Sequence, residues 1–132
     1  MRDERVVVHA SAMLDLLVNH NVGPILESRL QGCSLHAPAH IDVEVLTGLE
    51  RLARAGFLTT DALCRLAETL AVAPIERHSL ADLLSGAWQR RNVPALSLAA
   101  ALYVELASTL HAKLVTTDAE LVRASSACEL VA

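Results

Sequence analysis

Three side chains able to do acid–base or metal chemistry stand where structural elements of this chain are expected to meet. His9 follows three consecutive valines, and Asp118 follows a second apolar segment. Glu44 lies near the start of a long helical segment. If the two apolar segments are parallel strands, His9 and Asp118 lie at the carboxyl edge of one sheet, where open α/β sheets bind ligands. The sequence therefore brings one imidazole and two carboxylates toward one edge of the predicted sheet.

Each of these residues also has a purely structural interpretation. The carboxylate of Glu44 complements the dipole at a helix N-terminus, and Asp118 is a first-turn acid beside the candidate cap Thr117. His9 is then a neutral, hydrogen-bonded side chain. Spacing alone leaves both interpretations open. Asp42 stands two positions before Glu44 and should point to a different side of the helix, because residues i and i+2 do not share a helical face.

The elements that position these residues alternate along the chain. Apolar runs bounded by turn residues predict strands at 5–9, 35–37, 72–77, 113–116 and 129–131. Helical periodicity predicts helices at 11–18, 24–31, 40–55, 59–70, 79–90, 97–110 and 117–124. This alternation indicates an α/β fold, with a parallel sheet between helices. The length of the chain indicates a single domain over residues 1–132.

Local signals also predict helix ends and buried faces. Pro74 confines the strand at 72–77 to an edge or a strand start. In the helix at 40–55, the expected apolar stripe consists of Val43, Leu46 and Leu49 and, less strictly, Val45, Leu52 and Ala53. The expected N-caps and capping boxes are Ser11, Thr59 or Thr60, Ser97, residues 79–82 and residues 117–120.

Composition narrows the class of protein. The chain is 53% hydrophobic with one Trp, one Tyr and one Phe, and this apolar excess suggests a surface buried by a partner. Its net charge of −4 gives no general attraction to nucleic acid. The three scattered cysteines are expected to be free thiols. Neither a membrane span nor a secretion signal is evident, so we expect a cytoplasmic protein with no membrane partner.

Five segments of the chain, in order, resemble PIN domains, and specifically the VapC-type toxins of bacterial toxin–antitoxin pairs. They are residues 6–17, 35–46, 74–80, 97–107 and 114–121. The resemblance implies a three-layer α/β/α sandwich with a central, mostly parallel sheet. It also implies a Mg²⁺- or Mn²⁺-dependent endoribonuclease that hydrolyses phosphodiester bonds, a VapB-like antitoxin as partner, a homodimer, and contact with RNA.

The acidic site that the resemblance implies is half present. Glu44 and Asp118 match two of the family's four acids, with catalytic and metal-binding roles, whereas His9 and Ala100 stand at the other two positions. Imidazole is a poor Mg²⁺ ligand, and alanine offers none. The resemblance therefore implies a degenerate site, impaired or inactive as a Mg²⁺-dependent nuclease, in a protein that acts as a binding partner. The alternative is an active ribonuclease in which His9, Glu44 and Asp118 hold Mn²⁺ or Zn²⁺.

The remaining polar residues and the turn after the first strand bear on these hypotheses. By the same resemblance, Ser11 and Thr116 have supporting roles in the site. A nucleotide-binding α/β domain is a third hypothesis, but no glycine-rich phosphate loop follows the first strand. The histidines in which we find no metal-ligand spacing are His20, His36, His40, His78 and His111.

Overall fold

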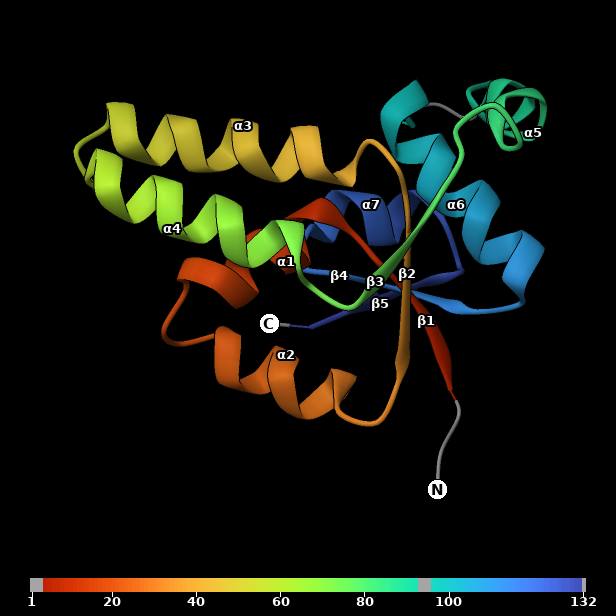
Figure 1. Cartoon of the computed structure of the whole chain (residues 1–132). Coiled ribbons are helices and arrows are strands. Elements are labelled where there is room, and N and C mark those ends of the chain that lie inside the picture. Colours follow the sequence, from red (N-terminus) through yellow and green to blue (C-terminus); the bar gives the residue numbers. More distant parts are fainter. Residues whose placement is uncertain (1–3, 93–95, 132) are drawn as a thin grey trace.

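The computed structural model describes residues 4–92 and 96–131, and a five-stranded sheet lies at its centre (Figure 1). The strands are β1 (Arg5–Val8), β2 (Ser34–Pro38), β3 (Ile75–His78), β4 (Lys113–Thr116) and β5 (Cys128–Leu130). Their order is β3-β2-β1-β4-β5, and every pair is parallel. The α/β fold with a parallel sheet is confirmed, and β3 is an edge strand, as Pro74 indicates.

Helices cover the sheet on two sides. They are α1 (Ala10–Val18), α2 (Gly23–Leu30), α3 (Ile41–Arg54), α4 (Thr60–Ala71), α5 (Leu84–Arg90), α6 (Leu98–Leu110) and α7 (Ala119–Ala124). Helix α6 packs against β1, β2 and β4 and carries α5, whereas α1 packs against α2 and α3, and α3 against α4 (Figure 1). None of the described helices is long and apolar enough to cross a membrane. The connection between the helices predicted at 79–90 and 97–110 falls partly outside the described residues.

The valines of β1 form the centre of the hydrophobic core. Val6, Val7 and Val8 are all 0% exposed, because β1 has a strand on each side in the sheet and α6 packed against it. Full burial of such a side chain stabilises the fold by about 1.5–3 kcal/mol. The strand that carries His9 at its end is therefore held firmly in place.

The structure confirms two of the predicted N-caps and contradicts the one predicted for α1. The expected caps at Thr59 and Ser97 are confirmed, since each hydroxyl accepts a backbone N–H three residues later. Ser11 is not a cap: the helix begins at Ala10, and His9 is its N-cap residue without a side-chain bond. The Ser11 hydroxyl instead bonds to residues around the end of β4, so a tertiary contact replaces the local one.

The apolar stripe predicted for α3 was right at Val45 and Leu49 but wrong at Val43 and Leu46. Val43 is 66% exposed and Leu46 is 40% exposed, whereas Ile41, Val45 and Leu49 are fully buried. Positions spaced by four lie along one row of a helix, and this row is the one that faces the core. The sequence is apolar on more than one side here, so periodicity alone could not select the buried row.

A capping box was predicted incorrectly before α5. Residues 80–83 form a turn, closed by the Leu83 N–H donating to the Leu80 carbonyl at 2.9 Å, and the helix starts only at Leu84, with Leu83 as an N-cap residue that makes no side-chain bond. Leu83 itself is buried. Packing of this residue rather than side-chain capping therefore sets the start of α5.

Candidate functional site

The topology of the sheet places the ends of β1 and β4 side by side. From β1 the chain continues to β2 and β3 on one side, and β4 and β5 then pair on the other side. The switch point, where open α/β sheets bind ligands, therefore lies between β1 and β4. His9 directly follows β1, and its backbone N–H donates to Val115 of β4 at 2.9 Å. Asp118 lies two residues beyond the end of β4.

The His9 ring is held by two hydroxyl groups. Its Nδ1 lies 2.8 Å from Ser11 Oγ and 3.0 Å from Thr116 Oγ1, and these oxygens lie 3.0 Å apart. Ser11 Oγ also accepts the N–H of Thr117, and Thr116 Oγ1 accepts that of Asp118. Burial lowers the pKa of His9, although Glu44 and Asp118 oppose this shift. A neutral imidazole is therefore fixed in orientation through Nδ1.

Glu44 is held from the first turn of α3. Its Oε1 accepts the hydroxyl of Tyr103 at 2.7 Å and lies 3.5 Å from His40 Nε2. The Tyr103 ring packs edge-on against His9, with centroids 4.8 Å apart, and lies 4.9 Å from the His40 ring. Burial and the Glu44 carboxylate raise the pKa of Tyr103 far above its usual value, so its hydroxyl stays protonated and donates.

Tyr103 and His40 also lie at this site, although the sequence patterns did not indicate them. His40 stands four residues before Glu44, and this spacing places both on one helical face, so a local signal existed. No local signal marks Tyr103, which comes from α6. His40 Nε2 lies 3.0 Å from the carbonyl of Ala99, and within the described part of the chain its buried Nδ1 has no hydrogen-bond partner.

Asp118 has a structural role as a helix cap, in addition to any role in chemistry. Its Oδ1 accepts the backbone N–H of Glu120 at 2.9 Å, so Asp118 is the N-cap of α7. The prediction that Thr117 opens this helix as part of a capping box was wrong, because Asp118 is the extended N-cap residue and its own carboxylate caps the helix.

Two residues bring no ligand to the site. Ala100 lies in the first turn of α6, where its backbone N–H donates to Ser97 Oγ, and its methyl group offers no ligand atom. Asp42 binds Arg77 through both carboxylate oxygens, at 3.0 and 3.1 Å. Its carboxylate is thus engaged away from Glu44, as helical geometry predicts.

The donor set fits some cations better than others. A neutral imidazole with the carboxylates of Glu44 and Asp118 suits Mn²⁺ or Zn²⁺, whereas Mg²⁺ prefers oxygen ligands alone. Among residues 4–92 and 96–131, the group of three side chains with converging metal-ligand atoms lies elsewhere, on β2 and β3. A cation held by His9, Glu44 and Asp118 therefore needs water molecules or side-chain movement to complete its coordination.

Comparison with known proteins identifies the family. No family model matches the chain. Ribonuclease VapC3 of Mycobacterium tuberculosis is 48% identical over 122 residues, which cover 92% of this chain and 88% of that protein. Ribonuclease VapC12 of the same organism is 31% identical over 131 residues, covering 96% and 99%.

A solved structure has the same fold. The crystal structure of M. tuberculosis VapC20, described as a sarcin-ricin loop cleaving toxin, matches with a TM-score of 0.66 at 18% identity and covers 91% of this chain and 95% of that one. The all-parallel sheet with helices on both sides is thus a PIN-like fold. The chain belongs to the VapC family of PIN-domain proteins.

Proposed function

We propose that this VapC-type protein is impaired as a Mg²⁺-dependent endoribonuclease and acts by binding a partner. The observation that supports this most directly is His9, a neutral imidazole fixed by Ser11 and Thr116 where the resemblance implies an acid. Glu44 and Asp118 supply the remaining negative charge. One oxygen of each is already engaged, by the Tyr103 hydroxyl and by the α7 N-terminus respectively.

The expected loss of rate follows from electrostatics. Mg²⁺ gives up its water ligands reluctantly and is attracted by carboxylates, so two missing acids weaken its binding and its positioning. Loss of one group that stabilises charge in a transition state costs on the order of 10²–10³ in rate. Two such losses within one coupled site need not add.

Each residue of the site would have a distinct role if a cation were bound. The cation would polarise the phosphate and lower the pKa of a bound water. Glu44 and Asp118 would hold it, and His9 would add a ligand through Nε2 when its Nδ1–H donates to a hydroxyl. Tyr103 orients the Glu44 carboxylate through its 2.7 Å hydrogen bond.

An RNA cleavage assay with restored acids tests this proposal. We expect the unmodified protein to show little cleavage of a structured RNA in Mg²⁺, and the double variant His9→Asp/Ala100→Asp to gain both Mg²⁺ binding and cleavage. The control variant Gln31→Glu/Gln89→Glu adds the same charge at two exposed positions and should gain neither. Equal cleavage by the unmodified protein and the double variant in Mg²⁺ would show that His9 and Ala100 are not missing ligands.

Cleavage with another metal is the second candidate function, and the fixed orientation of His9 favours it. Imidazole is a good ligand for Mn²⁺ and Zn²⁺. In this case the unmodified protein cleaves RNA in Mn²⁺ or Zn²⁺ but not in Mg²⁺, and His9→Ala abolishes the activity. If His9→Ala cleaves as well as the unmodified protein, His9 is not a ligand.

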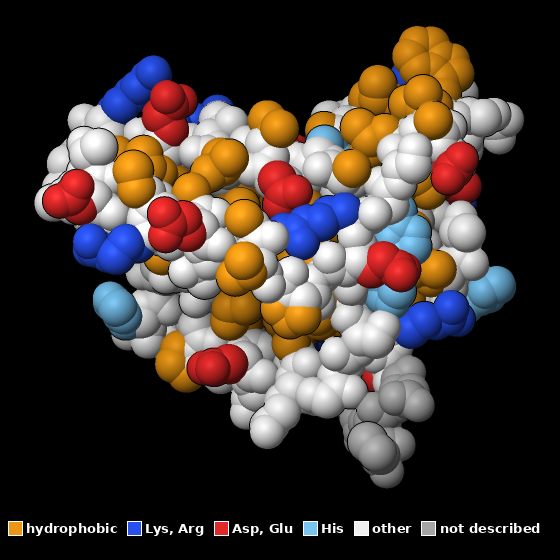
Figure 2. All heavy atoms as spheres, in the orientation of Figure 1, with side chains coloured by type: hydrophobic (Ala, Val, Ile, Leu, Met, Phe, Trp, Pro, Cys, Tyr) orange, Lys and Arg blue, Asp and Glu red, His pale blue; other side chains and the backbone are white. Residues whose placement is uncertain are grey.

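Exposed apolar side chains support the proposed binding role. Leu84 and Trp88 of α5 are 50% and 55% exposed, Leu98 at the start of α6 is 41% exposed, and Val43 and Leu46 of α3 are exposed as well. Figure 2 shows hydrophobic side chains gathered over these helices. We propose that a VapB-like antitoxin and a second copy of the chain cover such surfaces, in a cytoplasmic protein whose residues 1–132 form a single domain.

Light scattering and co-expression test these partners. Micromolar protein should scatter as a species of about twice the 14.1 kDa chain mass, and Trp88→Glu should shift it toward the monomer. The antitoxin is sought as a small protein encoded next to the gene, and it should co-purify with the chain. A monomer that fails to retain the neighbouring product would contradict the binding role.

A further inference from the structure

A second cluster of potential metal ligands lies on the other half of the sheet. His36 lies on β2, and Glu76 and His78 lie on the edge strand β3. The register pairs His36 with Glu76, and His78 lies two residues further along β3. Residues i and i+2 of a strand point to the same face, so the three side chains share one face of the sheet.

The ligand atoms of this cluster converge on one point. His36 Nδ1 lies 2.9 Å from His78 Nε2 and 3.0 Å from Glu76 Oε2, and His78 Nε2 lies 3.0 Å from the same Glu76 oxygen. Ligand atoms bound at about 2.0–2.1 Å around a tetrahedral Zn²⁺ are separated by about 3.3 Å. The triangle formed by these three ligand atoms therefore needs to open by only a few tenths of an ångström to surround a cation.

A neighbouring hydroxyl favours the tautomer of His36 that metal binding requires. Ser34 Oγ lies 2.7 Å from His36 Nε2. Metal-binding histidines commonly donate their other ring N–H to an oxygen, which fixes the ring and leaves the opposite nitrogen free to bind. When Nε2–H donates to Ser34, the lone pair of Nδ1 points into the cluster.

Solvent has access to the cluster from the side of the edge strand. The His36 side chain is 10% exposed and that of His78 is 25% exposed, whereas that of Glu76 is 65% exposed. Figure 2 shows histidine side chains beside an acidic one at the surface over the region of β2 and β3. A cation can therefore enter without unfolding the sheet, and water can occupy its fourth position.

We propose that His36, Glu76 and His78 form a binding site for a divalent transition metal, with Zn²⁺ as the best-suited ion. Two imidazoles and one carboxylate with an open position are a known zinc ligand set, and Mg²⁺ is disfavoured because two of the three ligands are nitrogen. The bound ion fastens β3 to β2. The proposal is independent of the site at His9, since it uses different residues on different strands.

Metal titration with matched variants tests the site. We use Co²⁺, whose visible absorption reports tetrahedral nitrogen and oxygen ligands, and Zn²⁺ in calorimetry, with the Glu44→Gln/Asp118→Asn double variant as background to silence the other site. We expect one ion per chain and a higher Tm in Zn²⁺, because a ligand that binds only the folded state stabilises it. Glu76→Gln should weaken binding by at least about 10-fold, since even residues that only orient a ligand are worth 10–100-fold in metal affinity.

The variants separate a metal site from a merely structural cluster. His78→Ala should also lose the absorption band, and His20→Ala, which removes an exposed histidine elsewhere, should retain it. Because the Glu76 side chain is largely exposed, Glu76→Gln will fold even if variants of His36 do not. Unchanged affinity in both Glu76→Gln and His78→Ala, or no binding of Zn²⁺ or Co²⁺ at all, would overturn the proposal.

Discussion

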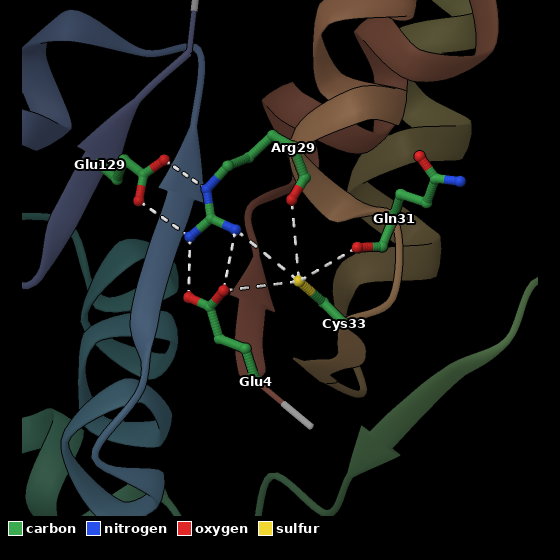
Figure 3. A network of polar contacts seen from close by, with 5 residues as sticks. All are labelled: Glu4, Arg29, Gln31, Cys33 and Glu129. Atoms are coloured by element: carbon green, nitrogen blue, oxygen red, sulfur yellow. Dashed lines mark hydrogen bonds and ion pairs between the residues drawn. The ribbon is translucent and has the colours of Figure 1, made fainter. Parts of the chain in front are cut away.

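Arg29 is the residue whose removal the structure allows us to evaluate most fully. It lies on α2 between Glu4, just before β1, and Glu129 of β5, and it pairs with both (Figure 3). Its guanidinium donates to Glu129 at 2.6 and 3.0 Å and to Glu4 at 2.9 and 3.2 Å. The side chain of Arg29 is 22% exposed, and those of Glu4 and Glu129 are 31% and 33% exposed.

The variant Arg29→Met keeps the aliphatic part of the side chain but removes the charge. Exposed ion pairs contribute about 0.2–1 kcal/mol, and breaking a fully buried pair costs about 3–5 kcal/mol. The partial exposure places this network between these limits, so we expect the free energy of unfolding to fall by about 2 kcal/mol at neutral pH. For a chain of this size, that corresponds to a decrease in Tm of about 8 °C.

The same variant should change how stability depends on pH. Arg29 lowers the pKa of Glu129 below its usual value of 4.5. Between the folded and unfolded pKa values of Glu129, the unfolded chain binds more protons than the folded chain. The stabilisation from Arg29 is therefore complete above the unfolded pKa and is lost as the pH falls through the lower folded pKa. The difference in unfolding free energy between the unmodified protein and Arg29→Met should therefore shrink below about pH 4.

Urea unfolding at neutral and acidic pH measures both effects. The control is Arg54→Met, because Arg54 pairs with Glu50 at 3.4 Å with side chains 77% and 56% exposed, and it should change stability by less than about 0.5 kcal/mol. Equal losses for the two variants at neutral pH would refute the argument that burial strengthens the Arg29 network. A difference that stays constant from neutral pH to pH 3 would refute its electrostatic origin.

Two smaller perturbations probe the site and a helix end. Tyr103→Phe removes the hydroxyl that donates to Glu44 and should lower the unfolding free energy by about 1–2 kcal/mol, since hydrogen bonds to charged groups are the stronger ones; no change in urea unfolding would mean that this bond contributes nothing. Thr59→Ala removes the cap of α4 and should cost about 1 kcal/mol, whereas Thr59→Asp, which can still cap, should cost little. An equal loss in both Thr59 variants would contradict the capping explanation.

Local patterns predicted much of the framework. The valines of β1, the alternation of strands with helices and the caps at Thr59 and Ser97 are all as the structure has them. These signals depend on neighbours within about four residues, which set backbone conformation and the burial of one face. For the same reason, the sequence could indicate that His9 and Asp118 follow strands of one parallel sheet.

Errors arose where a residue had to choose between local and distant partners. Ser11 bonds to Thr116, 105 residues away, instead of capping its own helix. In α3 the row of Ile41, Val45 and Leu49 is buried because it faces the core, although Val43 and Leu46 are equally apolar. A local rule identifies the candidates in such cases, and packing selects among them.

The sequence by itself determined the strands, most of the helices and the types of side chain available at the carboxyl edge of the sheet. Only the tertiary structure decided which of these side chains meet. The Tyr103 hydroxyl reaches Glu44 across 59 residues of chain, and His36 meets His78 across 42. The physical reason is that strand order and register are set by the packing of whole elements, which no short window of sequence contains.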